Sequence, residues 1–261
     1  MVTAMDKLGN DTIFPAPPTA GRGGIPSVGI GIPPTPNHSP DPRLQIWLSP
    51  AFPSGGFAYS HGLEWAVEAG DIRGLASAID WLDALLEHGA PRNDCILLAA
   101  AWRSAAAGDG RVLSETNELA LALAGSAERY LETSQQGTSF LLAVRAAWPT
   151  ANLEQLVTPA VAAWAYPVAV GACAGAHALS LEATLATFAT AAVNNLVSAL
   201  IRLGCIGQTD GQRAMAALLD PIARLASAAA HAGLDDLGQA AFRSDLAALL
   251  HETQYTRLFR S

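Results

Sequence analysis

Apolar residues recur with a helical period through most of this chain, and this pattern limits the possible folds more than any other feature of the sequence. Between Ile72 and Leu86 they stand three and four residues apart, with Asp80, Asp83 and Glu87 on the polar side. This spacing is typical of an α-helix with one side in a core and the other in solvent. Alternating, strand-like runs are absent from the sequence. It therefore predicts an all-α fold.

A second apolar stripe, over residues 181–203, has start and stop signals that agree with it. Ser180 stands in the N-cap position with Glu182 in the first turn, and Gly204 follows the stripe. Weak points are expected at Gly137 and Pro221. The other predicted helices cover residues 92–107, 115–148, 155–177, 210–231 and 235–254. Because no internal repeat is found, we predict a single-domain helical bundle over residues 43–261, with alanine-rich helices that approach closely.

Residues 1–42 differ in composition from the rest of the chain. They hold more than half of its 16 prolines, and a stretch so rich in proline and glycine can form neither ladders nor a core. They show neither the basic start and apolar run of a secretory signal nor the arginine-rich pattern of a transit peptide. We predict a disordered Pro/Gly-rich leader before the helical domain.

The charge balance excludes several classes of function. The formal net charge is -8, whereas nucleic-acid binding needs lysine and arginine clustered on one face. The only lysine, Lys7, lies in the predicted leader. The folded part therefore has no lysine for a Schiff base or a nucleotide-binding P-loop. If a nucleotide is involved, a partner protein has to bind it.

Cysteine and histidine positions give no sign of catalysis or of a metal site. Cys95, Cys173 and Cys205 are far apart and form no CxxC pair, which favours a reducing, cytoplasmic location. No two of the six histidines stand three or four residues apart on a helix. Motifs of the GxSxG, GxGxxG and EF-hand types are also missing. We expect a protein that binds other proteins, with no catalytic residue, metal or cofactor of its own.

An uncharged stretch runs from Glu154 to Glu182 and raises the alternative of a membrane span, for which about 20 apolar residues suffice. Pro159, Pro167 and His177 interrupt it, and no basic residues flank it to set an orientation. We predict instead a helix that is buried on nearly all sides or lies in a subunit interface.

Three segments are more specified than packing requires, and the first covers residues 47–64, which read WLSPAFPSGGFAYSHGLE. Pro53 and the two glycines after Ser54 predict a tight turn between two helices. Phe57 and Leu63 are expected to face the core. The side chains left to offer hydrogen bonds are Tyr59, Ser60 and Glu64. The alternative is an ordinary turn with a packed tyrosine.

The second segment, residues 203–213, reads LGCIGQTDGQR. Its first two glycines are expected to end one helix. Thr209 and Gln212 match a capping box that starts the next helix, with Asp210 at the positive end of the helix dipole. Gln208 is left without a structural role, in a polar loop where a partner could bind.

The third segment, residues 251–261, concentrates aromatic and arginine residues in an acidic protein. Tyrosine and arginine dominate the binding energy of many interfaces. Tyr255, Arg257 and Arg260 are therefore expected to attract an acidic partner, and the segment could order on binding. The alternative is a terminus on which Leu258 and Phe259 simply dock against the bundle.

Together these segments resemble the UreF family of urease accessory proteins, from about residue 44 to residue 261. The motifs LSPAFPSGGFAYSHGLE, GQTDGQ and QYTRLFRS follow in the family order. The resemblance implies an all-helical homodimer that joins the accessory protein UreD, also called UreH, and the nickel-binding GTPase UreG on the way to apo-urease. It implies a chaperone that couples GTP hydrolysis by UreG to delivery of nickel.

The resemblance also implies a set of partner-binding residues, but it does not show which of the partner proteins each residue contacts. They are Tyr59, Ser60, Gly62, Glu64, Gln208, Thr209, Asp210, Gln212, Tyr255, Arg257 and Arg260. His61 and Ser54 stand where family members vary and are left out.

Two alternatives to a binding scaffold stay open at this point. One is a direct regulator of GTP hydrolysis by UreG, which would place Arg257, Arg260 or Gln208 at the nucleotide. The other is a nickel carrier built from the scattered histidines and cysteines.

Overall fold

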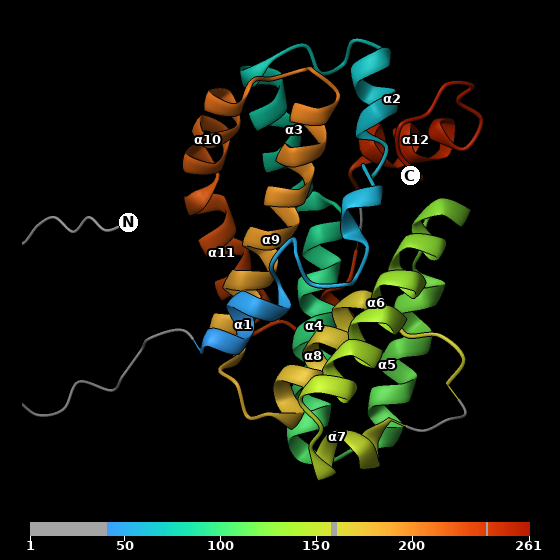
Figure 1. Ribbon diagram of the computed structural model, residues 1–261, viewed down its shortest axis with the longest axis vertical. Helices are drawn as coiled ribbons and strands as arrows, with labels where there is room; N and C mark the ends of the chain where they lie inside the picture. Colours follow the sequence, from blue (N-terminus) through green and yellow to red (C-terminus); the bar gives the residue numbers. More distant parts are fainter. Residues whose placement is uncertain (1–40, 158–160, 239) are drawn as a thin grey trace, which may run out of the picture. The chain divides into compact units, whose positions relative to one another are not determined.

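The computed structural model describes residues 41–157, 161–238 and 240–261, and among these it contains helices and no strand. The all-α prediction is confirmed (Figure 1). The α-helices are α1 (Pro42–Trp47), α2 (Leu63–Glu68), α3 (Leu75–His88), α4 (Ala90–Ala107), α5 (Gly110–Ala122), α6 (Ala127–Ala147), α7 (Ala151–Leu156), α8 (Tyr166–Ala176), α9 (Leu181–Arg202), α10 (Gln208–Ala217), α11 (Leu219–Ala229) and α12 (Phe242–His251). Short 3-10 helices are η1 (Gly56–Ala58) and η2 (Leu234–Asp236).

Nearly all of the predicted leader, residues 1–40, lies outside the described residues. Its last two residues start α1, with Asp41 as the N-cap and Pro42 as the first helical residue. The Asp41 side chain accepts a hydrogen bond from the backbone N–H of Arg43, and Pro42 occupies the first helical position. Proline is well tolerated there because the N–H that it lacks has no partner within the helix.

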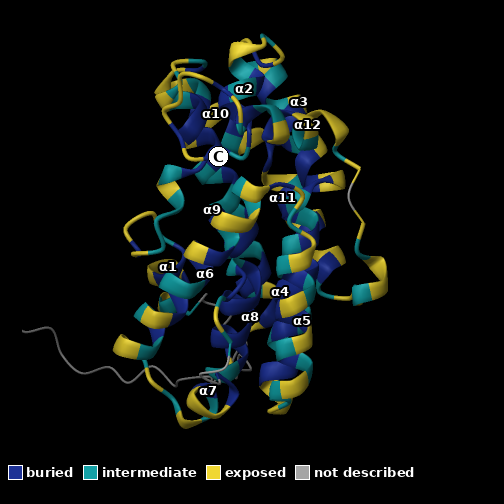
Figure 2. Ribbon diagram, turned by 90° about the vertical axis from the view of Figure 1, so that its right-hand side faces the viewer, coloured by how far each residue is buried: buried dark blue, intermediate teal, exposed yellow. Residues whose placement is uncertain are grey.

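Helices α4 and α8 form the centre of the bundle. Every residue from Pro167 to Gly175 of α8 is buried, and Figure 2 shows this helix almost entirely in the colour for burial. It packs chiefly against α4 and then against α6. A Cβ atom added to Gly171 would lie 2.3 Å from the carbonyl oxygen of Leu98, and one added to Gly175 would lie 2.4 Å from that of Trp102. The predicted close approach of helices with small residues is confirmed here.

Outside residues 158–160, which the structure does not describe, the uncharged stretch contains no helix long enough to cross a membrane. Its apolar helix, α8, has 11 residues, about half of what a span needs. Among the described helices α9 does meet the criteria of length and composition, with half of its most apolar window buried in the bundle. A core helix gives the same signal, so this is weak evidence for a span.

The caps predicted for residues 181–203 are confirmed. The Ser180 side chain accepts a hydrogen bond from the N–H of Ala183 at the start of α9. Gly204 has φ +72° after its end, in the left-handed region that favours glycine.

Other predicted boundaries are wrong. The helix predicted over residues 115–148 breaks before the N-cap Ser126, whereas Gly137 lies inside α6. The glycine allows close approach there, because a Cβ atom would lie 2.0 Å from the carbonyl oxygen of Trp164. The helix predicted over 155–177 is divided into α7 and α8, and that over 235–254 is shortened to α12. The break near Pro221 falls at Leu218, and the proline lies in the first turn of α11.

The capping box predicted at Thr209 is also wrong. The N-cap of α10 is Gly207, without any side-chain hydrogen bond, so Thr209 lies inside the first turn of the helix. Gln208, predicted to lie in a loop, begins that helix.

Replacing Gly171 by valine should lower the free energy of unfolding by about 3 kcal/mol or more, because the added carbons would force α4 and α8 apart. Urea unfolding measures this change. Gly125→Ala is the matched control, since no atom lies within 4 Å of a Cβ atom at that position. Equal stability of the two variants would contradict the close packing described for α4 and α8.

Candidate functional site

The turn between α1 and α2 is fastened to α9 through its backbone. The Asn195 side chain donates a hydrogen bond to the carbonyl oxygen of Gly56 at 3.1 Å, and Arg202 donates to that of Phe57. Leu63 is fully buried, as predicted, whereas Phe57 is 67% exposed. The expectation that Phe57 faces the core is wrong. Arg202 holds its backbone carbonyl, and the ring is left in solvent.

The end of the chain lies alongside this turn. The backbone N–H and the hydroxyl of Ser60 both donate to the carbonyl oxygen of Ser261, each at 2.5 Å. In the opposite direction, the backbone N–H of Arg260 donates to the carbonyl oxygen of Ala58 at 2.8 Å. Two segments that the sequence separates by about two hundred residues are therefore bonded through their main chains.

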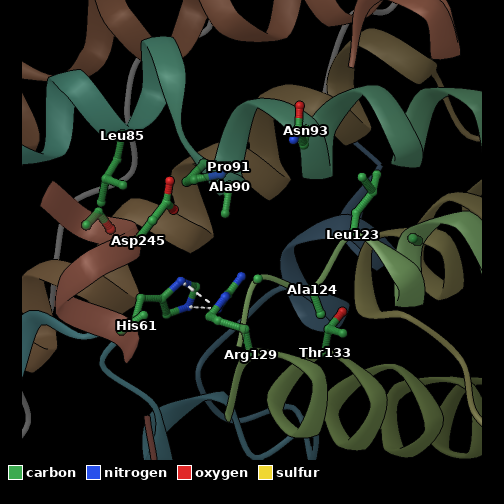
Figure 3. A pocket seen from close by; sticks show the side chains of 14 residues that line it. His61, Leu85, Ala90, Pro91, Asn93, Leu123, Ala124, Arg129, Thr133 and Asp245 are labelled. Carbon is green, nitrogen blue, oxygen red and sulfur yellow. Dashed lines mark hydrogen bonds between the residues drawn. The ribbon is translucent and has the colours of Figure 1, made fainter. Parts of the chain in front are cut away.

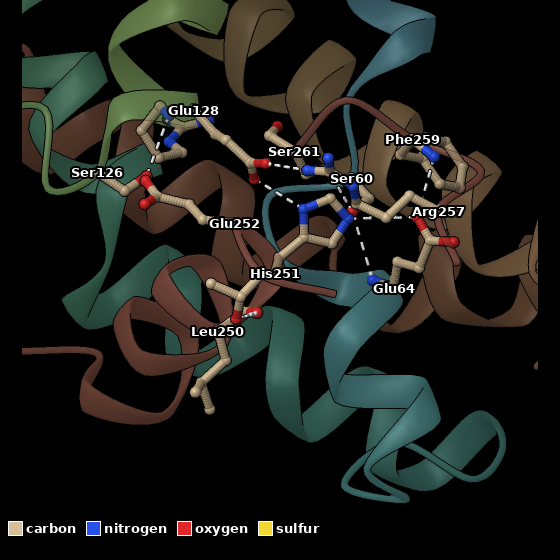
Figure 4. Close-up of polar contacts among 12 residues, drawn as sticks. Ser60, Glu64, Ser126, Glu128, Leu250, His251, Glu252, Arg257, Phe259 and Ser261 are labelled. Carbon is tan, nitrogen blue, oxygen red and sulfur yellow. Dashed lines mark hydrogen bonds and ion pairs between the residues drawn. The ribbon is translucent and has the colours of Figure 1, made fainter. Parts of the chain in front are cut away.

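The carboxylate of Glu64 makes a further link between the two segments (Figure 4). One of its oxygens accepts from the N–H of Leu258 at 2.6 Å, and the other accepts from that of Phe259 at 2.9 Å. Glu64 is buried, so its charge needs hydrogen-bond donors inside the chain. These two backbone groups provide them and fix the path of the chain end.

His251 extends this link to α6 (Figure 4). Its ring is fully buried, with Nε2 at 3.3 Å from a Glu64 oxygen and Nδ1 at 2.7 Å from a Glu128 oxygen. The other oxygen of Glu128 accepts from Arg257 at 2.7 Å. We call Glu64, His251, Glu128 and Arg257 the tail clamp. It joins α2, α6, α12 and the segment after α12.

Gly62 has a packing role in the described chain. It caps α2 with φ +76°, and a Cβ atom there would lie 2.6 Å from the backbone nitrogen of Ala248. Helix α12 therefore rests directly on this glycine.

A second polar cluster, which we call the arginine cluster, lies beside the tail clamp and consists of Arg129, Glu132, His61 and Asp94. Arg129 forms an ion pair with Glu132. Its guanidinium lies 2.7 Å from Nδ1 of His61, and Figure 3 draws these two side chains facing each other. His61 Nε2 lies 2.7 Å from the other Glu132 oxygen, and Asp94 lies 4.0 Å from the guanidinium. The hydroxyl of Ser261 donates to Glu132 at 3.1 Å. Ser261 thus contacts the arginine cluster as well as Ser60.

The pKa values of the two carboxyl groups in the arginine cluster are shifted in opposite directions. Burial raises the pKa of Asp94 to about 6, against the opposing charges of Arg129 and His61. Burial also acts to raise the pKa of Glu132, but the charges of Arg129 and His61 and their hydrogen bonds outweigh it, and the pKa falls to about 2. Glu132 is therefore held ionised by its neighbours.

Two cavities flank the arginine cluster. The larger, of about 160 Å³, is lined by His61, Asp94, Arg129 and Glu132 together with side chains of α9. The smaller, of about 70 Å³, also reaches His61 and Arg129 (Figure 3). Within residues 41–157, 161–238 and 240–261 no group of three or more histidine, cysteine, aspartate or glutamate side chains is arranged to hold a metal ion. Within each cluster, the described ionic side chains form ion pairs and hydrogen bonds with one another.

The predicted site residues of the first segment are mostly inside the protein. Tyr59, Ser60 and Glu64 are buried. The Tyr59 hydroxyl donates to Gln135 at 2.6 Å, and burial raises its pKa while a hydrogen bond with Arg260 opposes the rise. Their hydrogen bonds are made within the chain, and contact with a partner stays a prediction.

The residues predicted near the chain end divide into anchors and exposed groups. Phe259 is buried under the guanidinium of Arg202, which lies 4.3 Å from its ring centre. Tyr255 is fully exposed, and Leu258 is 58% exposed. Arg257 and Arg260 are also exposed. Contacts within the chain hold the segment in this structure, and ordering on binding stays a prediction.

The residues predicted on the second segment lie elsewhere. Gln208, Thr209 and Gln212 are exposed on α10, and Asp210 pairs with Arg213 at 2.9 Å. In Figure 1, α10 lies on the far side of α9 from α12 and the chain end. The predicted residues therefore form two separate surfaces.

Sequence reasoning missed most of both clusters, namely Asp94, Glu128, Arg129, Glu132 and His251. The i, i+3 spacing of Arg129 and Glu132 was a usable signal for an ion pair on one helix face. The pairing of Glu128 with residues 251 and 257 has no local signal, because it joins distant segments.

Comparison with known proteins places these features in a family. The UreF family model matches residues 72–219. The "Urease accessory protein UreF" of Methylobacterium radiotolerans is 54% identical over 219 residues, which cover 84% of this chain and 96% of that protein. The same-named protein of Xanthobacter autotrophicus is 56% identical over 218 residues, 84% of this chain and 90% of its own. That of Rhodopseudomonas palustris strain HaA2 is 54% identical over 219 residues, which cover 84% of this chain and 92% of that protein.

Changing Glu64 to glutamine should loosen the chain end, because the amide nitrogen cannot accept one of the two backbone hydrogen bonds. Loss of a buried acceptor costs about 1–3 kcal/mol. Trypsin should then cut after Arg257 faster than in the wild type, with cleavage followed by mass spectrometry. Glu118→Gln makes the same chemical change at an exposed position and is the control. Unchanged cleavage after Glu64→Gln would rule out the tail clamp as the anchor.

Asp94 should make stability decrease as pH rises from about 4 to about 7. Its pKa is about 6 in the folded protein against an ordinary value of 3.8, so the folded state binds more protons in this range. The loss amounts to at most about 3 kcal/mol. Asp94→Asn removes this pH-dependent loss. As pH rises, the free energy of unfolding in urea should therefore increase for the variant relative to the wild type. Parallel pH profiles would contradict the assignment.

Proposed function

The chain belongs to the UreF family of urease accessory proteins, and we propose that it is a maturation chaperone that joins UreD, also called UreH, and the GTPase UreG to apo-urease. In this role it provides binding surfaces, while UreG binds nucleotide and nickel and its GTP hydrolysis drives nickel insertion. We propose further that it acts in the cytoplasm as a homodimer and has no catalytic residue, metal or cofactor of its own.

The observation that carries this proposal is an exposed set of side chains on a fixed backbone. Tyr255, Arg257, Leu258 and Arg260 point outward from a segment that the tail clamp and Ser60 hold in place. A preorganised surface loses little conformational entropy on binding, so more of its contact energy contributes to affinity. Tyrosine and arginine are also the residues that most often dominate such interfaces.

The charge of this surface indicates an acidic partner. Arg202 and Arg260 have no carboxylate partner within the described residues, although the whole chain has a net charge of -8. Arg202 contacts the Phe57 carbonyl and the Phe259 ring, and Arg260 contacts the Tyr59 hydroxyl. Guanidinium groups that no described carboxylate neutralises are available to carboxylates of another protein.

A second candidate function, direct regulation of GTP hydrolysis by UreG, rests on Arg260 being exposed without a carboxylate partner. Gln208 lies on α10, on the other side of α9 from α12 and the chain end (Figure 1), so we propose Arg260 in preference to it. Arg257 is held by Glu128. An arginine supplied to a GTPase raises its turnover by about a thousandfold or more. No rise in GTP turnover when this chain is added to UreG would exclude that role.

Arg260→Glu should weaken assembly with UreD and UreG by at least about tenfold while leaving the fold intact, because charge reversal repels an acidic partner and the side chain is exposed. Size-exclusion chromatography with light scattering measures the complex and also tests for the homodimer. Arg224→Glu, an exposed arginine on α11, is the matched control. Assembly that resists the Arg260 change but fails with the Arg224 change would place the binding surface elsewhere, and a wild-type chain that ignores both proteins would contradict the scaffold itself.

A further inference from the structure

Helix α12 carries large apolar side chains on its outer face. Phe242, Leu246 and Leu249 are 79%, 56% and 48% exposed. They stand at positions i, i+4 and i+7, so they share one side of the helix. The opposite side, with Ala247 and Ala248, packs against α2. The helix therefore buries its small residues in the bundle and leaves its large ones without contacts of matching size.

A groove of about 370 Å³ continues this face between α3 and the start of α12. Trp81, Ala84 and Leu85 form its floor on α3, and Phe242 forms its edge. Trp81 is buried, and the guanidinium of Arg243 lies 5.4 Å from its ring centre. We call the groove together with the exposed side of α12 the α3–α12 face. Contiguous exposed apolar surface of this kind marks interaction sites in soluble proteins.

The charged groups around the α3–α12 face are predominantly acidic. Arg243, the arginine that lines the groove, is bonded to Asp71 at 2.6 Å. Asp80 also lines the groove, and Glu87 is exposed about two turns further along α3. Asp80 has no ion-pair partner among the described residues, and the one ion-pair partner of Glu87 among them is His88, which lines the groove, with its Nε2 3.7 Å from the Glu87 carboxylate. The surface near the chain end has the opposite sign, since its arginines are the groups left without partners.

We propose that the α3–α12 face is a second protein-docking surface, which binds a segment with an apolar side chain for the groove and lysine or arginine residues for Asp80 and Glu87. This rests on the proposed scaffold function and deepens it. The two surfaces then select different proteins of the assembly by charge. Like charges brought together repel each other, so a segment that suits one surface is rejected by the other.

The charge also argues against other occupants. In a two-fold contact between copies of this chain the same patch meets itself, which would bring the acidic rims together. An anionic membrane would be repelled, because its surface attracts basic and not acidic segments. A basic partner protein is the occupant that both the apolar groove and its rim fit.

The test measures the dissociation constants of the full chain with purified UreD and with purified UreG. The double variant Phe242→Ser, Leu246→Ser should weaken binding of one of them by at least about tenfold, as loss of central interface residues does. Asp80→Lys should weaken binding of the same protein, and this effect should diminish at high salt. Both changes are on exposed positions, and circular dichroism confirms that the variants fold.

The matched controls are Leu219→Ser, with the same 56% exposure as Leu246, and Asp220→Lys, both on α11. They should leave both dissociation constants within about twofold of the wild type. If the wild type binds but the α12 and Asp80 variants bind equally well, or change only the oligomeric state of the chain, the inference is overturned and the scaffold function stands. A wild type that binds neither protein overturns both.

Discussion

A charge buried inside a helical bundle has to find its hydrogen-bond donors inside the chain, and in this protein that constraint fixes the arrangement of the functional segments. Glu64 lies on α2, and its own turn supplies too few donors for a buried carboxylate. The donors come from Leu258 and Phe259, nearly two hundred residues later. Because an unsatisfied buried charge is costly, the chain end cannot leave without destabilising α2. Glu132 repeats the principle with Arg129, His61 and Ser261.

The helical framework could be predicted from the sequence because its signals are local. The apolar period gave the helix class, and Ser180 and Gly204 marked both ends of α9. Gly137 was misread because a glycine inside a helical pattern can be a weak point or a place of close approach. Only the position of Trp164 against α6 decides which. The side chain of Phe57 was likewise misplaced, because its backbone carbonyl is bonded to Arg202, a residue distant in the sequence.

The same limit applies to the candidate site. The three motifs were visible in the sequence as unusual runs, and two of them do meet in space. Their composition suggested exposed binding groups, but a glutamate and a serine within a motif can be anchors as easily as contacts. Glu64 and Ser60 turn out to hold the chain end, while Tyr255 and Arg260 lie in solvent. Burial of a charged side chain depends on long-range pairing, which no local pattern encodes.

This division between anchors and exposed groups changes how the chain end has to be tested. Removing residues 255–261 would delete the exposed side chains, and it would also take both backbone donors from Glu64 and the partner of the Ala58 carbonyl. Loss of binding after such a truncation would therefore mix a damaged turn with a missing surface. Substitutions at Arg260 or Tyr255 leave the backbone hydrogen bonds in place. Those at Tyr255 therefore report on the surface, and those at Arg260 remove in addition its contact with the Tyr59 hydroxyl. Glu64 is bonded to Leu258 and Phe259, which directly precede Arg260 in the chain. Substitutions at Glu64 test how the chain end is positioned, and those at Arg260 test how this surface is recognised by a partner.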